Sequence, residues 1–302
     1  MTDRKILSAL LRNARMPIAH VAKAARVSRE VAAYRIDRLQ RRGIILRFVT
    51  RINLAALGFM EASVFCNVRD DARTRFRDYI RQSAHLSWVS EHNGIWNFGL
   101  GIVGRTLREI DSHYTDSLRA FGKDIINSRF SMLKRIRFFW ERSLGGAVHP
   151  LPSIRAVALD KKDKKILSLL SNNARADYTT LARELKMTGQ TIKHRLMVLK
   201  RAGVIEQYSA FIDLSKLGLY QYSVFFNDTA VLRAAETHDA VVFTVEYVGD
   251  PFCEVGIVVK NPFKLREVLG ELRQACPEAQ VIEHSLVQED IVSTGPPRCV
   301  FE

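Results

Sequence analysis

The sequence predicts an α+β protein in which one two-domain unit occurs twice. The chain aligns with itself without a gap over its early segments: residues 3–8 (DRKILS) match residues 163–168 (DKKILS), and residues 13–15 (NAR) match residues 173–175 (NAR). Since a domain usually takes roughly 100–200 residues, a chain of 302 residues has room for such a pair. A repeat of this length indicates a duplicated pair of domains rather than a solenoid.

Each copy begins with a pattern of three short helices. Apolar residues at helical spacing predict helices over 3–12 and 18–25, and Ser28 is a suitable N-cap for a third helix. Thr188 is the corresponding N-cap in the second copy. A β-rich segment over 44–52 follows, which we expect to form a small wing. Three helices and a wing in this order predict a winged helix-turn-helix domain.

The rest of each copy alternates strand patterns with helix patterns. In the first copy, segments rich in Val, Ile, Phe and Trp predict strands near 59–68, 86–93, 96–103 and 126–139, with helices at 72–83 and 106–121. The second copy repeats this order with strands near 219–227, 241–248, 252–260 and 279–292 and a helix at 262–275. It is shorter by about five residues between its first two strands. The order βαββαβ predicts a ferredoxin-like domain.

The predicted fold class is therefore α+β, with two winged helix-turn-helix domains, each followed by a ferredoxin-like βαββαβ domain. A segment rich in glycine and proline separates the two copies and is typical of a linker. The expected boundaries are 1–54 and 160–214 for the winged helix-turn-helix domains, 55–144 and 215–302 for the βαββαβ domains, and 145–159 for the linker.

The chain is strongly basic. It contains 46 Lys and Arg against 32 Asp and Glu, a net charge of +14, which favours a polyanionic partner such as nucleic acid or an anionic surface. Residues 1–53 hold 13 basic and 3 acidic residues, whereas residues 160–213 hold 11 and 6. We therefore expect the first helix-turn-helix to bind DNA more strongly by electrostatics. Charges interrupt the apolar stretches of the N-terminal segment, so we expect no signal peptide, no membrane association and a cytoplasmic location.

Three motifs of the first copy give a resemblance to a known family. They are D-x-K-I-L-x-x-L-x-x-N-A-R over 3–15, S-R-x-x-x-x-x-R-x-x-x-L-x-x-x-G-I-I over 28–45, and N-L-x-x-L-G over 53–58. Together with the βαββαβ order, the chain resembles the Lrp/AsnC (feast/famine) family of archaeal and bacterial transcription regulators, in a tandem, fused form. The resemblance implies that the first domain binds double-stranded DNA. It also implies that the βαββαβ domain dimerises and often senses an amino acid or related metabolite.

The third helix of a helix-turn-helix presents the side opposite its buried face to the major groove. In the first copy the candidate DNA-binding residues are Ser28, Arg29, Glu30, Tyr34, Arg35, Arg38, Arg41 and Arg42, with Arg47 on the wing. In the second copy they are Thr188, Gln190, Lys193, His194, Arg195, Lys200 and Arg201. Arginine can contact guanine and glutamine can contact adenine, so the two helices carry different side chains. We therefore expect two unlike half-sites in the DNA.

Two of these arginines leave alternatives open. Arg35 and Arg195 occupy the same place in both copies, which suits either a phosphate contact or an internal ion pair that fixes the helix. A basic run such as Arg38, Arg41 and Arg42 is usually a solvated helix face, and only the local charge excess favours DNA contact.

The resemblance also implies an effector site at the glycine turn between the second and third strands of each βαββαβ domain. The candidate residues are Gly94, Trp96, Asn97, Gly249 and Asp250. An aspartate here would bind a ligand ammonium through a charge-assisted hydrogen bond, but the first copy, Asn93-Gly94-Ile95-Trp96-Asn97, has Asn where the family commonly has Asp. The alternative is purely structural: the glycines form a turn and Trp96 packs at an interface. The resemblance allows a small-molecule effector that is amino acid-like, and the sequence does not identify which ligand it is.

Two other functional classes remain open. No H-x-x-x-H, H-E-x-x-H, G-x-S-x-G or phosphate-loop motif occurs, so we expect no metal, no cofactor and no enzyme activity. Tandem siroheme decarboxylases, however, also join a helix-turn-helix to a βαββαβ domain. They would need basic residues around a tetrapyrrole, for which the first copy offers His92, His113, Arg129, Arg135 and Arg137. The third class is an architectural DNA binder with little sequence preference.

The predicted sheets indicate how the chain assembles. Each βαββαβ sheet alone leaves an apolar face uncovered, so we expect either an intrachain pseudo-dimer or a homo-oligomer. The four cysteines show no C-x-x-C spacing, which argues against a zinc ribbon or a disulfide framework. We expect most of them to be buried and Cys299 to be exposed.

Overall fold

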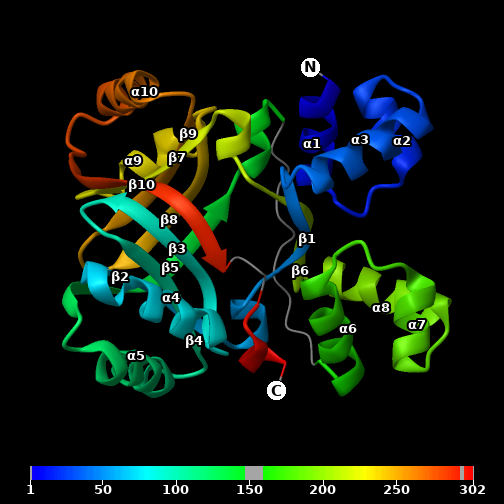
Figure 1. Ribbon diagram of the computed structural model, residues 1–302, viewed down its shortest axis with the longest axis horizontal. Coiled ribbons are helices and arrows are strands. Elements are labelled where there is room, and N and C mark those ends of the chain that lie inside the picture. Colours follow the sequence, from blue (N-terminus) through cyan, green and yellow to red (C-terminus); the bar gives the residue numbers. More distant parts are fainter. Residues whose placement is uncertain (1, 147–158, 293–295, 302) are drawn as a thin grey trace. The chain divides into compact units, whose positions relative to one another are not determined.

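The computed structural model divides the chain into two compact units, each assembled from corresponding segments of both copies of the repeat (Figure 1). The described residues are 2–146, 159–292 and 296–301. The first unit comprises the described residues within 1–59, 146–213 and 294–302, and the second comprises those within 60–145 and 214–293. Most of the predicted linker, 147–158, lies outside the described residues. Copy one and copy two below mean the described residues before and after this segment.

The first unit contains two groups of three helices with a two-stranded antiparallel sheet between them (Figure 1). Copy one supplies α1 (Thr2–Arg12), α2 (Ile18–Ala25), α3 (Arg29–Arg41), β1 (Ile45–Ile52) and a short 3-10 helix (Ala55–Leu57). Copy two supplies α6 (Lys161–Asn172), α7 (Tyr178–Leu185), α8 (Gly189–Arg201) and β6 (Ile205–Ile212). A further 3-10 helix (Arg298–Val300) follows the last strand of the chain.

The third helix of each group begins at the N-cap that the sequence predicts. The Ser28 hydroxyl accepts a hydrogen bond from the Val31 backbone N–H at 3.2 Å, and the Thr188 hydroxyl accepts one from Thr191 at 3.1 Å. Each helix buries one apolar face: Ala32, Ile36 and Leu39 in α3, and Ile192, Leu196 and Leu199 in α8. Local sequence therefore determines where both helices begin and which side they bury.

The predicted wing differs from expectation. Among the described residues, each copy contributes one strand to this region, and β1 pairs antiparallel with β6 of the other copy instead of with a hairpin partner of its own. Val49 lies opposite Ser209, and the register runs symmetrically from this position. A single strand leaves a row of unpaired N–H and C=O groups, and the duplicated strand satisfies them. The small wing is thus a joint sheet of both copies.

The helices interlock with that sheet across the repeat. Helix α1 packs against β6, and α6 packs against β1, so each copy covers the strand of the other. The Ala14 N–H donates to the Tyr208 carbonyl at 2.8 Å, and the Ala174 N–H donates to the Phe48 carbonyl at 3.0 Å. These reciprocal bonds relate the two helix groups by a pseudo-two-fold axis within the unit.

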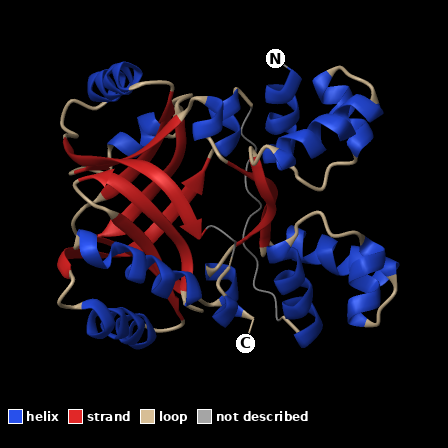
Figure 2. Ribbon diagram, in the orientation of Figure 1, coloured by secondary structure: helices blue, strands red, loops and turns tan. Residues whose placement is uncertain are grey.

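The second unit is an eight-stranded antiparallel sheet closed on itself, with helices on its outer face (Figure 2). Its strands run in the order β10-β3-β4-β2-β5-β8-β9-β7, and β7 pairs again with β10. Copy one supplies β2 (Met60–Val68), α4 (Arg73–Gln82), β3 (Leu86–Gly94), β4 (Phe98–Gly104), α5 (Leu107–Phe121) and β5 (Ile125–Phe138). Copy two supplies β7 (Tyr220–Phe226), α9 (Val231–Ala235), β8 (Val241–Val248), β9 (Cys253–Val259), α10 (Pro262–Ala275) and β10 (Val281–Val292). Short 3-10 helices add Asp70–Ala72, Trp140–Leu144 and Ser215–Leu217.

Each copy therefore folds in the predicted βαββαβ order. The five-residue helix α9 stands where copy one has the ten-residue α4, in agreement with the shorter second copy. Two junctions close the sheet, one between β5 and β8 and the other between β3 and β10.

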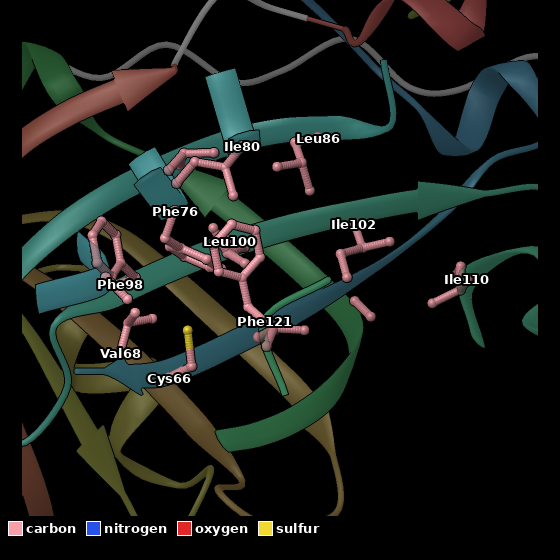
Figure 3. Packing of buried hydrophobic residues seen from close by; sticks show 14 residues of the cluster. Cys66, Val68, Phe76, Ile80, Leu86, Phe98, Leu100, Ile102, Ile110 and Phe121 are labelled. Atoms are coloured by element: carbon pink, nitrogen blue, oxygen red, sulfur yellow. The ribbon is translucent and has the colours of Figure 1, made fainter. Parts of the chain in front are cut away.

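Alternation along the strands divides the side chains between an outer and an inner core. On the outer side of copy one, Cys66 and Val68 of β2 pack with Phe76 and Ile80 of α4, and α5 contributes Ile110 and Phe121 (Figure 3). Cys66 and Cys253 are buried as expected. Cys276 and Cys299 are half-buried, so two of the four cysteines are buried rather than most of them, and Cys299 is not exposed as expected.

The inner core joins the two copies. Phe65, Trp96, Phe225, Phe243 and Tyr247 lie in one buried cluster that draws on strands or turns of both. A closed sheet of eight strands is just wide enough for side chains to fill its interior, and these large rings do so here. The apolar faces predicted to need a cover are therefore turned inward.

Candidate nucleic-acid interface

Helix α3 presents a charged face that nothing in its own helix group covers. Arg29, Glu30, Tyr34, Arg38 and Arg42 are exposed, and the Tyr34 side chain is 60% exposed. Backbone and Ser28 hydrogen bonds at the helix start lower the pKa of the Glu30 carboxyl. The first turn of α3 is thus held in a fixed conformation while its side chains stay available.

The last turn of α3 continues the basic surface. Arg41 forms an exposed ion pair with Asp37 one turn earlier. Such a pair on a helix surface contributes little to stability, so the guanidinium can exchange this partner for a phosphate at small cost.

Helix α8 presents an equivalent but different face. Thr188, Gln190, Lys193, His194 and Arg201 are exposed. Lys200 is exposed too, and its Nζ lies 5.8 Å from the centre of the Tyr208 ring. The face of α8 carries one guanidinium, two ammonium groups, an amide and an imidazole. The face formed by α3 and its C-cap residue carries four exposed arginines.

Arg35 and Arg195 form internal ion pairs. Arg35 Nη1 lies 2.7 Å from Asp3 Oδ1 and ties α3 to α1. Arg195 Nη1 lies 2.8 Å from Asp160 Oδ2 and 2.7 Å from Asp163 Oδ1, and these carboxylates raise the pKa of the guanidinium. Of the two alternatives for these residues, the geometry favours the ion pair that fixes the third helix.

Arg47 lies on β1 and is half-buried. Its guanidinium carbon lies 4.9 Å from the centre of the Phe211 ring of β6. Its neighbour on β1, Leu46, is 51% exposed. The charged Arg47 side chain therefore packs on the joint sheet, while the apolar Leu46 side chain faces outward.

Sequence reasoning missed the residues that fix the two helix groups to one another. Arg15 Nη1 donates to the carbonyls of Ala174 and Ala176, both at 2.7 Å. Arg175 donates in return to the Ala14 carbonyl. The repeated Asn-Ala-Arg triplet was the available signal, because an exposed arginine needs no counterpart at the same place in both copies. These contacts hold α3 and α8 in one unit.

The candidate effector turn is largely engaged within the protein. Trp96 is buried and its Nε1 donates to Glu283 Oε1 at 2.8 Å. The Asn97 side chain accepts from the Val68 N–H at 2.9 Å and donates to the Val68 carbonyl at 2.8 Å. At Gly94 a Cβ would lie 2.8 Å from Ser285 Oγ, so the glycine permits close approach of β10. These contacts favour the structural alternative for copy one.

The corresponding turn of copy two is open. Gly249 and Asp250 are exposed, and no atom would meet a Cβ at Gly249 within 4 Å. The backbone of Gly249 has φ +91°, a conformation that favours glycine. The backbone carbonyl of Asp250 accepts a hydrogen bond from Ser131 Oγ at 3.3 Å, and the Asp250 carboxylate takes no part in this bond.

The basic residues considered for a tetrapyrrole are committed to protein partners. His92 is buried, its Nε2 lies 2.7 Å from Ser90 Oγ, and burial lowers its pKa to about 4. His113 stacks on His85 with ring centres 3.5 Å apart. The arginines are ion-paired with glutamates of copy two: Arg129 with Glu283, Arg135 with Glu236 and Glu246, and Arg137 with Glu236.

Two further searches concern the described residues only. No helix over 2–146, 159–292 and 296–301 is long and apolar enough to cross a membrane. The same part of the chain brings together no group of three His, Cys, Asp or Glu side chains suited to a metal ion.

The paired, capped and exposed third helices define the class of protein: it carries two helix-turn-helix motifs joined through a common sheet. Residues 1–40 match the AsnC-type helix-turn-helix domain, and residues 159–206 match the winged helix-turn-helix DNA-binding family.

Several known proteins match less than half of this chain over most of their own length. An uncharacterized HTH-type transcriptional regulator of Pyrococcus abyssi is 32% identical over 139 residues, which cover 93% of that protein and 43% of this chain. An uncharacterized HTH-type transcriptional regulator of Pyrococcus furiosus is 30% identical over 149 residues, which cover 96% of that protein and 46% of this chain. The regulator LrpB of Bacillus subtilis is 28% identical over 120 residues, which cover 80% of that protein and 38% of this chain. The chain belongs to the Lrp/AsnC family of helix-turn-helix transcription regulators.

Solved structures of one tandem protein resemble almost the whole length of the chain. The siroheme decarboxylase NirDL covers 98% of this chain and 94% of its own, with a TM-score of 0.62 and 13% identity. At this identity the likeness concerns the fold alone. It agrees with the tandem α+β architecture.

Proposed function

We propose that this protein is a sequence-specific DNA-binding transcription regulator that acts as an intrachain pseudo-dimer. The observation that carries the proposal is the joint sheet of β1 and β6, which holds α3 and α8 in one unit with their outer faces exposed. In single-copy helix-turn-helix proteins, two chains are needed to present two such helices. Here one chain presents both.

The expected target is an imperfect inverted repeat. The pseudo-two-fold through Val49 and Ser209 relates α3 to α8, and dimeric helix-turn-helix proteins bind half-sites about 10 bp or a multiple of this apart. Arg29 and Arg38 of α3 favour guanine, whereas Gln190 of α8 favours adenine. Unlike helices therefore select unlike half-sites.

The proposal assigns no effector. Trp96 and Asn97 are held by protein partners, and in copy two only the exposed turn at Asp250 retains an acidic side chain for an amino acid-like ligand. A ligand there would rest on the family resemblance alone.

Selection of bound DNA from a random pool tests the proposal. The full chain should enrich a two-part motif, and its Kd for that motif should be at least about 1000-fold lower than for unrelated DNA at the same salt concentration. A ratio of the two Kd values near one would contradict sequence-specific regulation and would indicate architectural binding, which depends on charge alone.

A tetrapyrrole-dependent enzyme is the alternative suggested by the fold likeness to NirDL. Titration of the purified chain with an iron porphyrin, followed in the Soret region, separates the two. The DNA-binding proposal predicts no saturable spectral change. A saturating change that is lost in His92→Gln and Arg129→Met, but kept in the exposed-site control Arg119→Ala, would favour the enzyme.

A further inference from the structure

The second unit has a pseudo-two-fold axis of its own. Phe65 of β2 pairs with Arg129 of β5, and the matching Phe225 of β7 pairs with Glu283 of β10. Arg129 and Glu283 therefore occupy the same place in the two copies. Phe65 and Phe225 touch edge to face with ring centres 4.9 Å apart, and Arg129 forms an ion pair with Glu283. Equivalent residues that touch one another must lie at the axis.

The two junctions of the closed sheet obey the same symmetry. At one, Leu133 lies opposite Tyr247 and Arg135 opposite Glu246; at the other, Val287 lies opposite His92 and Glu289 opposite Glu91. Even the register shift falls at the same step in both. Backbone pairing by itself therefore does not distinguish copy one from copy two, and a sheet of either copy could close on a second sheet of its own kind.

The charged side chains, in contrast to the backbone pairing, distinguish copy one from copy two. Seven ion pairs between described residues cross from one copy to the other in this unit, and each has its basic group on copy one and its acidic group on copy two. They are Arg77–Glu289, Arg81–Glu289, Arg129–Glu283, Lys134–Glu246, Arg135–Glu236, Arg135–Glu246 and Arg137–Glu236. The charge excess of the chain is divided in the same direction, since residues 1–150 hold 27 basic and 13 acidic residues while residues 151–302 hold 19 of each.

The pair at the axis is the best shielded of the seven. The side chains of Arg129 and Glu283 are 16% and 8% exposed, whereas the rim arginines 135 and 137 are about half exposed. The Arg129 guanidinium lies 4.7 Å from the Phe225 ring centre and 5.1 Å from that of Trp96, whose Nε1 also donates to Glu283. Removing or reversing one partner of a shielded pair is costly because the other charge stays buried.

We propose that the Arg129–Glu283 pair selects pairing of copy one with copy two and excludes pairing of either copy with itself. Two copy-one sheets would bring two Arg129 side chains together at the axis, and two copy-two sheets would bring two Glu283 side chains together. Pairing of two copy-two sheets would also place Glu289 opposite Glu246 at both junctions. In the native unit Arg77 of copy one contacts both Glu91 and Glu289, and this arginine would be missing from such a pair. The sheet of copy one therefore accepts the sheet of copy two as its partner and rejects a second sheet of its own kind.

Charge reversal in the full-length chain provides the first test. Arg129→Glu and Glu283→Arg should each lower the melting temperature by roughly 10 °C, because each places like charges at the axis. The double variant restores opposite charges, although it loses the Trp96 hydrogen bond, and should recover more than half of that loss. The control Arg119→Glu alters an exposed pair within copy one and should change the melting temperature by less than about 2 °C. A double variant no more stable than the weaker single variant would overturn the proposal.

Co-expression of the two single variants, each full-length and with its own affinity tag, tests selection itself and tolerates instability of either variant alone. Opposite charges can then meet at an axis only between the two different chains. The mixed pair should co-purify at least about tenfold more than either variant co-expressed with itself. Equal co-purification in the three cases would overturn the proposal.

This inference rests on the pseudo-dimer of the proposed function, but neither readout involves DNA. Failure of charge selection would leave the DNA-selection result unaffected. Failure to bind DNA would leave the charge-reversal result unaffected.

Discussion

The Trp88 indole packs directly on the backbone of Gly101, its neighbour across β3 and β4: a Cβ at position 101 would lie 2.2 Å from Trp88 Nε1. Copy two repeats this relationship with Phe243 and Gly256, where a Cβ would lie 2.1 Å from the Phe243 ring. Both aromatic rings belong to the inner cluster that joins the copies or pack against it. The glycines therefore shape the interior of the closed sheet.

Alanine at either glycine should destabilise the second unit. Gly101→Ala and Gly256→Ala each force an aromatic ring to move within a packed interior, at an expected cost of about 3 kcal/mol in the free energy of unfolding. Gly270→Ala is the control, because the added Cβ on α10 meets nothing within 4 Å apart from its chain neighbours and the nearby backbone of its own helix, and it should stabilise the helix by about 0.5–1 kcal/mol. Urea denaturation of the three variants measures this; equal effects at 101 and 270 would contradict the packing account.

Arg15 should contribute to the pairing of the two helix groups. Arg15→Ala removes bonds to two carbonyls and the contact with the Tyr178 ring, whose centre lies 4.9 Å from the guanidinium carbon. The expected loss is about 2–3 kcal/mol in the stability of the first unit. Arg12→Ala, an exposed arginine at the end of α1, should change stability by less than about 0.5 kcal/mol. If thermal denaturation finds the two variants alike, Arg15 does not fix the pairing.

His92 should make the second unit sensitive to acid. Its pKa is about 4 in the folded chain and about 6.5 when exposed, so the unfolded chain binds more protons between these values. Stability should therefore fall as the pH drops from 6.5 to 4, by about 3 kcal/mol for this residue. His92→Gln removes this contribution. Unfolding free energies at pH 7 and pH 4.5 should differ less for the variant than for the wild type; the same difference in both would assign the acid sensitivity to other groups.

The α3 face should dominate the electrostatic part of DNA binding. Arg38→Ala/Arg41→Ala should weaken binding more than Lys193→Ala/Lys200→Ala, and should flatten the plot of log Kd against log salt by about 1–2, since each phosphate contact adds about 0.9 to the slope. The basis is the net charge of +10 in residues 1–53 against +5 in residues 160–213, from 13 − 3 and 11 − 6. Titrations at several salt concentrations decide the order. Equal losses would mean that net charge does not identify the stronger helix.

Local patterns predicted the parts of the fold that depend on local physics. The caps at Ser28 and Thr188 and the βαββαβ order follow from residue types and spacing, and the structure confirms them. The pairing of β1 with β6 could not be predicted in the same way. A lone β-rich segment does not indicate which strand completes its hydrogen bonds.

Contacts between distant residues account for the rest. Arg35 meets Asp3 across 32 positions, so spacing alone left its role open between phosphate and ion pair. Arg129 and Glu283 are 154 positions apart and are unlike in charge, so the self-alignment of the sequence gave no reason to connect them. The DNA-contacting residues themselves remain predictions, because exposure makes them available without showing that they are used.

Hydroxyl-radical footprinting of the full-length protein on a selected site tests whether one chain presents two unlike recognition helices to DNA. Two protected tracts of unlike sequence are expected, about 10 bp apart from centre to centre or a multiple of this. Gln190→Ala/Lys193→Ala should abolish protection over one tract and leave the other. A single tract in the wild type, or uniform protection along the fragment regardless of sequence, would show that the chain does not read two half-sites.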